Sequence, residues 1–161
     1  MDRGFTERDR EILKKSELFA GLSGERLAAS LDFFEASPAR YGKGEFLHRV
    51  GSRLARFGLV LSGRVQVHMD DFEGNRIIMA NVTPGMTFGE SLCFLGTEEE
   101  PVTISAAEDV KVAWLRTEGV RRIRATAADH ELVLRFIRLV ARSGLAMNGR
   151  IQILSKRSLR D

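Results

Sequence analysis

The sequence has few of the residues that build covalent frameworks or metal centres. Cys93 is the one cysteine among 161 residues, which rules out an internal disulfide framework and a multi-cysteine cluster supplied by this chain alone. The three histidines, at 48, 68 and 130, are scattered, whereas a cupin-type metal enzyme needs clustered histidine and glutamate ligands. No Ser-His-Asp or Cys-His signature of nucleophilic catalysis stands out. We therefore expect neither catalysis nor a bound metal.

Long apolar segments are also missing. No apolar run approaches the roughly 18 residues that a membrane-spanning helix needs. The first ten residues include six charged ones, so the N-terminus lacks the apolar core of a signal peptide. Apolar residues make up 43% of the chain and charged residues 29%, which is the balance of a folded globular domain. We expect a cytoplasmic protein with no membrane partner.

The net charge of +3 is unevenly distributed along the chain. Residues 117–161 hold ten arginines or lysines against four aspartates or glutamates, and the preceding residues hold fifteen against eighteen. A basic C-terminal segment after a mildly acidic body indicates an anionic partner near that end. The alternative interpretation is that these arginines cover the solvated face of one helix.

Short β-prone runs separated by glycines occupy the middle of the chain. Glycines recur at 44, 51, 63, 74, 85 and 96, and the residues at 65–69 alternate between apolar and polar, as in a strand with one wet face. This spacing predicts a β-sandwich or barrel, which we interpret as an eight-strand roll. A hairpin loop is expected at 71–75 and a tight turn at Pro84-Gly85. The β-prone runs lie at 45–49, 57–61, 64–69, 76–82, 102–106 and 110–115.

Helical patterns flank these strands. Residues 5–31 have a helical pattern, with Ser23 as the N-cap of a helix that carries Leu27 and Leu31. Thr117 can cap a short helix over 118–124, and a long helix begins near Asp129.

The long helix carries two neighbouring apolar stripes. The first has the 4-3 spacing of a coiled-coil seam, and at 1.5 Å per residue it is about 30 Å long. The second would pack on the helix's own domain, which leaves the first for a partner helix. Alternatively, both stripes form one broad face buried within a monomer. The first stripe is Val133, Ile137, Val140, Gly144, Met147, Ile151 and Leu154; the second is Leu132, Phe136, Leu139, Ser143 and Ala146.

The order of these segments resembles the Crp/Fnr family of bacterial transcription regulators. The motifs that carry the resemblance are Tyr41-Gly-Lys-Gly-Glu45, Leu59-Val-Leu-Ser-Gly-Arg-Val-Gln-Val67 and Pro84-Gly-Met-Thr-Phe-Gly-Glu90. The resemblance covers nearly the whole chain. It implies a mostly β fold with flanking helices: a double-stranded β-helix, or jelly roll, of the cyclic-nucleotide-binding type, followed by a long C-terminal dimerisation helix.

The resemblance also implies a domain organisation and partners. Residues 1–126 would form the sensor domain with its N-terminal helices, 127–154 the dimerisation helix, and 155–161 the start of a hinge. The winged helix-turn-helix that enters the major groove of DNA would begin where this sequence stops. We therefore expect a homodimer that senses a small-molecule effector and reaches DNA only through that further domain.

A predicted ligand site follows from the family's Gly-Glu pair, which introduces a short helix beneath the nucleotide phosphate. Gly89 and Glu90 match this pair and are followed by Ser91 and Leu92. A glycine lets a ligand approach the backbone closely, and a helix N-terminus presents unpaired N–H groups to an anion. The resemblance gives the carboxylate of Glu90 the family's contact to the ribose hydroxyl.

The sequence departs from the family at the phosphate itself. The family's phosphate-binding arginine and the serine or threonine after it correspond by count to Glu100 and Pro101, and no arginine occurs between Arg76 and Arg116. A glutamate in place of the arginine turns a charge-assisted contact worth roughly 1.5–3 kcal/mol into repulsion. We therefore expect an effector other than a cyclic nucleotide. A cyclic-nucleotide binder with an unusual phosphate site and a ligand-free structural dimeriser are the alternatives.

The remaining site residues come from the long helix. Counted back from the hinge, Met147 and Asn148 stand where the family reaches the base, so an adaptable thioether and an amide would face the ligand. Core packing of Met147 and simple exposure of Asn148 are the alternatives. The haem and iron–sulfur branches of the family need ligands that this sequence does not place at matching positions, so we expect no cofactor.

Overall fold

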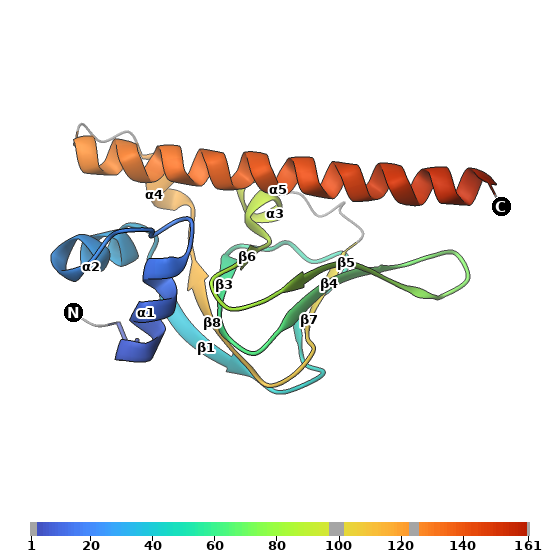
Figure 1. Ribbon diagram of the computed structural model, residues 1–161, viewed down its shortest axis with the longest axis horizontal. Helices are drawn as coiled ribbons and strands as arrows, with labels where there is room; N and C mark the ends of the chain where they lie inside the picture. The colour runs from blue at the N-terminus through green and yellow to red at the C-terminus, as the bar shows by residue number, and fades with distance from the viewer. Residues whose placement is uncertain (1–2, 97–101, 123–125, 161) are drawn as a thin grey trace.

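The computed structural model of the chain describes residues 3–96, 102–122 and 126–160, with side chains through residue 143. Two helices precede a roll of eight strands, one short helix interrupts the strands, and two helices follow them (Figure 1). The helices are α1 (Glu7–Lys15), α2 (Gly24–Phe33), α3 (Glu90–Leu95), α4 (Glu118–Arg121) and α5 (Ala127–Arg160). The strands are β1 (Ser37–Tyr41), β2 (Phe46–His48), β3 (Phe57–Ser62), β4 (Val65–Asp70), β5 (Arg76–Val82), β6 (Thr87–Phe88), β7 (Thr103–Ala106) and β8 (Val110–Leu115).

The strands form two antiparallel four-stranded sheets, in the orders β1-β8-β3-β6 and β2-β7-β4-β5. The predicted jelly-roll class is confirmed, and all six predicted runs contain strands. β1 and β6 were not among those runs. β1 contains Pro38, which a strand tolerates at the edge of a sheet, and β6 has only two residues. The loop after β4 is the predicted hairpin, because Asp71 accepts hydrogen bonds from the backbone N–H groups of Glu73 and Asn75.

Two apolar clusters hold the molecule together. One fills the space between the sheets, where Phe88 packs edge-to-face on Trp114 with ring centroids 5.6 Å apart. The other lies between the outer face of the β1-β8-β3-β6 sheet and the helices. Residues of β8 contribute side chains to both clusters. The strand is buried along its whole length, as expected of a strand covered on both faces.

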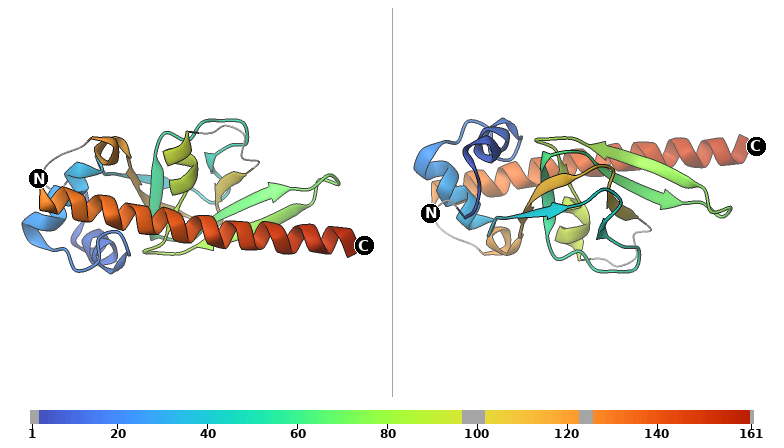
Figure 2. Two further views of the ribbon diagram at one scale, coloured as in Figure 1. Left: turned by 90° about the horizontal axis from the view of Figure 1, so that it is seen from above. Right: turned by 90° about the horizontal axis from the view of Figure 1, so that it is seen from below.

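Helix α5 lies along the whole length of the molecule, from the α1 and α2 end to the tip of the β4–β5 hairpin (Figures 1 and 2). Leu132, Phe136 and Leu139 of the second predicted stripe are buried in the cluster beneath the helix. Phe136 contacts Phe57 with ring centroids 5.3 Å apart. Within the described residues, no helix combines the length and apolar character that a bilayer span requires.

The ends of the shorter helices differ in detail from the sequence prediction. Ser23 and Thr117 are the N-cap residues of α2 and α4, as predicted, but neither side chain makes a capping hydrogen bond. The capping box instead lies at α1, where the Thr6 hydroxyl accepts from the Asp9 N–H and the Asp9 carboxylate accepts from the Thr6 N–H.

Candidate effector site

The turn into α3 is built around Gly89. Its φ of 74° is in the left-handed region, and a Cβ at this position would lie 2.5 Å from Cδ2 of Leu54. Both the backbone conformation and the close approach of Leu54 therefore require glycine. This turn begins α3 directly beneath α5, and the two helices pack against each other (Figure 1).

Glu90, the first residue of α3, is buried with an exposed fraction of 3%. The hydroxyl of Ser143 on α5 donates a hydrogen bond to Oε1 of Glu90. Burial raises the pKa of the Glu90 carboxyl group, and the hydrogen bond from Ser143 offsets only part of that shift. Among the described residues, neither Oε2 of Glu90 nor the buried Oγ of Ser91 has a hydrogen-bond partner. Two buried polar atoms without a partner among the described residues thus lie at the start of α3.

The rest of α3 packs into the protein. Leu92 contacts the cluster between the sheets, and Cys93 is buried in the cluster beneath α5. The Cys93 sulfur lies 4.0 Å from the Thr117 hydroxyl, and burial raises the pKa of the Cys93 thiol. A buried thiol with a raised pKa has little thiolate character and is therefore unreactive.

The structure describes half of the predicted ligand site. Gly89, Glu90, Ser91 and Leu92 are contiguous at the turn and first residues of α3. Glu100 and Pro101 lie outside the described residues, and Met147 and Asn148 belong to α5 but their side chains are outside the description. The sequence placed Ser143 in the stripe facing its own domain and missed its contact with Glu90. A hydroxyl within an otherwise apolar stripe was the signal for that contact.

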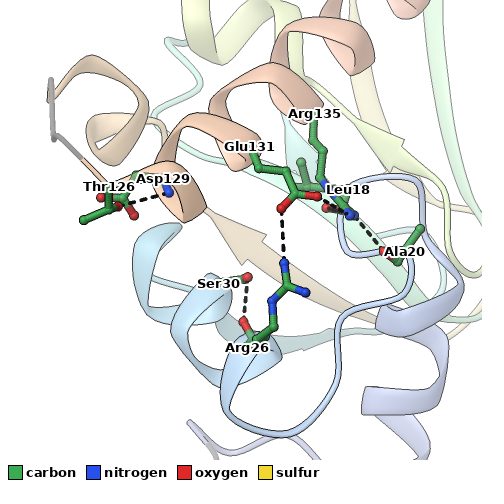
Figure 3. A network of polar contacts seen from close by, with 8 residues as sticks. All are labelled: Leu18, Ala20, Arg26, Ser30, Thr126, Asp129, Glu131 and Arg135. Atoms are coloured by element: carbon green, nitrogen blue, oxygen red, sulfur yellow. Dashed lines mark hydrogen bonds and ion pairs between the residues drawn. The ribbon is translucent and has the colours of Figure 1, made fainter.

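The N-terminal part of α5 is fixed to the segment around α2 by charged side chains (Figure 3). Arg135 donates hydrogen bonds to the carbonyl oxygens of Leu18 and Ala20, at 3.3 and 2.8 Å, and to the Glu131 carboxylate at 3.1 Å. Glu131 also accepts from Arg26 of α2 at 3.1 Å. Besides its buried face, α5 is therefore held by polar contacts at this anchor and, two turns further on, at Glu90 and at the ion pair of Arg142 with Glu17.

The predicted dimer seam is described over its first three positions. Ile137 is 53% exposed, while Val133 and Val140 are half-buried beside the cluster beneath the helix. Leu134, which the sequence prediction did not include, is 54% exposed on the same helix. The side chains of Gly144, Met147, Ile151 and Leu154 are outside the described part of α5. A partly exposed apolar edge therefore lies next to the buried stripe of α5.

The histidines occupy separate surroundings. His48 and His68 are buried on β2 and β4, and Nε2 of His68 lies 3.0 Å from the Ser105 hydroxyl, whereas His130 is exposed on α5. Within the described ranges, no group of three or more histidine, cysteine, aspartate or glutamate side chains could hold a metal ion.

Residues 38–127 match the cyclic nucleotide-binding domain family, which is more than half of the chain. The chain therefore belongs to the cyclic nucleotide-binding domain family. This match includes the Gly89-Glu90 turn and all the strands after β1. No curated protein is similar enough to this sequence to count as a match.

Among solved structures, the chain is similar to regulators and to one enzyme. It is 24% identical to the N-terminal domain of a transcriptional regulator from Streptomyces coelicolor A3(2), covering 87% of this chain and 94% of that chain, with a TM-score of 0.64. It is 26% identical to the catabolite activator protein of Thermus thermophilus, covering 90% and 62%, with a TM-score of 0.58. It is 25% identical to a cAMP-binding acyltransferase from Mycobacterium smegmatis, covering 80% and 39%, with a TM-score of 0.59.

The resemblance to sensor domains of Crp/Fnr-type regulators is thus confirmed. The chain spans nearly all of the separate Streptomyces domain but less than two thirds of the Thermus activator and of the acyltransferase. The fold therefore occurs both in regulators and as one part of an enzyme.

Proposed function

We propose that this chain is the effector-sensing and dimerisation part of a Crp/Fnr-type transcription regulator, and that its effector is a small molecule other than a cyclic nucleotide. It has no catalytic role in this proposal. DNA would be bound by a winged helix-turn-helix domain of the same regulator, which places its action in the cytoplasm.

The observation that carries the proposal is the hydrogen bond between Glu90 and Ser143. It joins the turn at the family's ligand site directly to the helix that carries the exposed apolar edge. A molecule that binds next to the start of α3 and shifts it changes the surroundings of this contact. Effector binding and the position of α5 would then be coupled, and the coupling is reciprocal by thermodynamic necessity.

The charges near the site argue against a cyclic phosphate. The segment that would supply the family's arginine contains Glu98, Glu99 and Glu100 instead. An uncharged or cationic effector with a hydrogen-bonding group suits these residues better, because a phosphate would meet repulsion without a bidentate partner.

Ligand binding can be tested by thermal unfolding of the purified chain with cAMP, with cGMP and with a library of uncharged metabolites. We expect no stabilisation by either nucleotide and a saturable shift with a library member, equal to about 2.7 kcal/mol at 100 times its dissociation constant. The shift should fall in Glu90→Gln and stay unchanged in the control Glu45→Gln, an exposed carboxylate near β2. Saturable binding of cAMP that requires Glu90 would contradict the proposed effector class.

Dimerisation can be tested with Ile137→Glu, which places a charge on the exposed apolar edge of α5. We expect this variant to elute as a folded monomer in size-exclusion chromatography with light scattering, while the unmodified chain is a dimer. Ala128→Glu adds the same charge to an exposed position in the first turn of α5 and should remain dimeric. A dimeric Ile137→Glu variant would show that this edge is not the interface.

A further inference from the structure

A cavity of about 330 Å³ lies between the ends of the roll's first two strands and the segment that leads into β3. Its walls come from Tyr41, Trp114, β2, Arg49 and residues 52–56, and none of residues 89–92 lines it. The cavity therefore uses other residues than the candidate effector site, although Leu54 lies at the boundary between the two, against Gly89. Its volume is within the range of about 300–1,000 Å³ that is typical of small-molecule sites.

Three arginines, Arg49, Arg53 and Arg56, line this cavity. The guanidinium carbon of Arg56 lies 4.8 Å from the ring centroid of Trp114, and that of Arg49 lies 4.5 Å from the ring centroid of Phe46. Stacking on an aromatic face restrains the planar guanidinium and leaves the N–H groups at its edge available to an oxyanion. In the part of the chain that the structure describes, no carboxylate forms an ion pair with any of the three.

The inner wall of the cavity is aromatic and rigid. Trp114 is 3% exposed, and its indole N–H donates to the Tyr41 hydroxyl at 3.0 Å. The two rings also pack edge-to-face, with centroids 6.3 Å apart. Tyr41 is half-buried and is the part of this wall that a flat apolar ligand could contact.

His48 supplies an unused polar group at the same wall. Its side chain lines the cavity and the residue is 7% exposed. It makes no hydrogen bond to another described residue. Burial lowers the pKa of His48, so its ring is neutral at pH 7 and can donate one hydrogen bond and accept another. A neutral imidazole at this wall can hydrogen-bond to a polar group of a bound molecule.

We propose that this cavity binds a small aromatic anion, a single ring that carries one phosphate or carboxylate group. The three arginines hold the charged group, since the guanidinium fork matches both oxyanions. The ring of the ligand lies against Tyr41, next to the stacked pair of Arg56 and Trp114, and His48 hydrogen-bonds to a polar substituent. This second site adjoins the proposed effector site at Leu54 but is built from other residues and takes a different ligand.

Trp114 makes the proposal measurable, because it is the only tryptophan in the sequence. The probes are phenyl phosphate and benzoate, with benzamide as the uncharged analogue and inorganic phosphate as the anion without a ring. Binding is followed by tryptophan fluorescence and by isothermal titration calorimetry. We expect saturable binding of at least one aromatic anion, and at least tenfold weaker binding of benzamide and of inorganic phosphate.

Variants locate the site. Arg56→Gln and Arg49→Gln should each weaken binding about tenfold, because each removes a charge-assisted contact. The control combines Arg8→Gln, Lys15→Gln and Arg122→Gln, which remove exposed positive charges outside the cavity and should leave the affinity unchanged. Glu90→Gln should also leave it unchanged.

Four results would overturn the proposal: no saturable binding of either aromatic anion, equal affinity for benzamide or inorganic phosphate, equal weakening in the control combination, or loss of binding in Glu90→Gln. The last of these would assign the anion to the effector site. Failure of the effector proposal, by contrast, leaves the fluorescence titration and its arginine dependence untouched.

Discussion

Replacing Ser143 by alanine tests the contact between α3 and α5 directly. The change removes the only hydrogen-bond donor that reaches the Glu90 side chain from α5 among the described residues. Because Glu90 is 3% exposed and its Oε2 already lacks a partner, water cannot replace the lost bond at Oε1. Leaving a buried acceptor unsatisfied costs about 1–3 kcal/mol. Alanine recovers up to about 0.5 kcal/mol through its higher helix propensity. We expect a net loss of about 1–2 kcal/mol in the free energy of unfolding.

The assay is urea unfolding at pH 7 with linear extrapolation, on a double-mutant cycle of Ser143→Ala and Glu90→Leu. In the Glu90→Leu background, Ser143→Ala should be neutral or slightly stabilising, since only the propensity effect remains. Ser62→Ala, at the exposed end of β3, is the control for loss of a hydroxyl. An equal effect of Ser143→Ala in both backgrounds would refute the reasoning, because no energy would then depend on the pair.

Three further predictions concern other buried groups. Glu90→Gln should flatten the dependence of stability on pH, measured by unfolding at a series of pH values from 4 to 8. Burial raises the pKa of Glu90 in the folded state. Its contribution to stability is therefore fully present below the ordinary pKa of 4.5 and is lost as the pH rises through the folded-state pKa. Lys111→Met should destabilise the protein by about 3 kcal/mol in urea unfolding at pH 7, because it leaves the buried Asp9 carboxylate without its ion-pair partner. Burial would raise the pKa of Asp9, but the hydrogen bonds from Lys111 and Thr6 and the charge of Lys111 together lower it. The contribution of this ion pair to stability is therefore present above pH 3.8 and is lost as the pH falls below that value. An unchanged acid transition in Lys111→Met would contradict this. Phe136→Ala should cost about 3–5 kcal/mol, seen as a lower urea midpoint, because the ring is 1% exposed within the aromatic cluster beneath α5.

The strands and the long helix could be predicted because their signals are local. Alternation along 65–69 and the glycines that end each run follow from the period of a strand and the geometry of a turn. The stripe of Leu132, Phe136 and Leu139 follows from the helical period in the same way.

The anchor of α5 and the arginine-lined cavity could not be predicted in this way. Arg135 binds carbonyl oxygens of Leu18 and Ala20, more than a hundred residues away in sequence, and carbonyl groups leave no signature in the sequence. The cavity joins Tyr41 and Trp114 across a pairing of β1 with β8 whose register the sequence does not reveal. Contacts of this kind depend on the tertiary fold and become visible only in the structure.

Among the contacts of α5, which include the Arg142–Glu17 ion pair, those at Arg135 and Ser143 bear on how a change at Glu90 would move the helix. The anchor at Arg135 and the contact at Ser143 are eight residues apart, about 12 Å at 1.5 Å per residue, and α5 continues to Arg160, about 25 Å beyond Ser143. A rigid helix that pivots at the anchor therefore moves about three times as far at Arg160 as at Ser143.

The pivot requires Arg135, so Arg135→Gln should loosen it. Hydrogen exchange of the α5 amides over residues 131–139 should become about tenfold faster, because the charge-assisted bonds to two carbonyl oxygens and to Glu131 are lost. Arg138→Gln, an exposed arginine without a described ion-pair partner on the same helix, should leave these rates unchanged. Equal exchange rates in the two variants would mean that the buried face alone holds this end of α5, and the helix would then have no defined pivot through which α3 could move it.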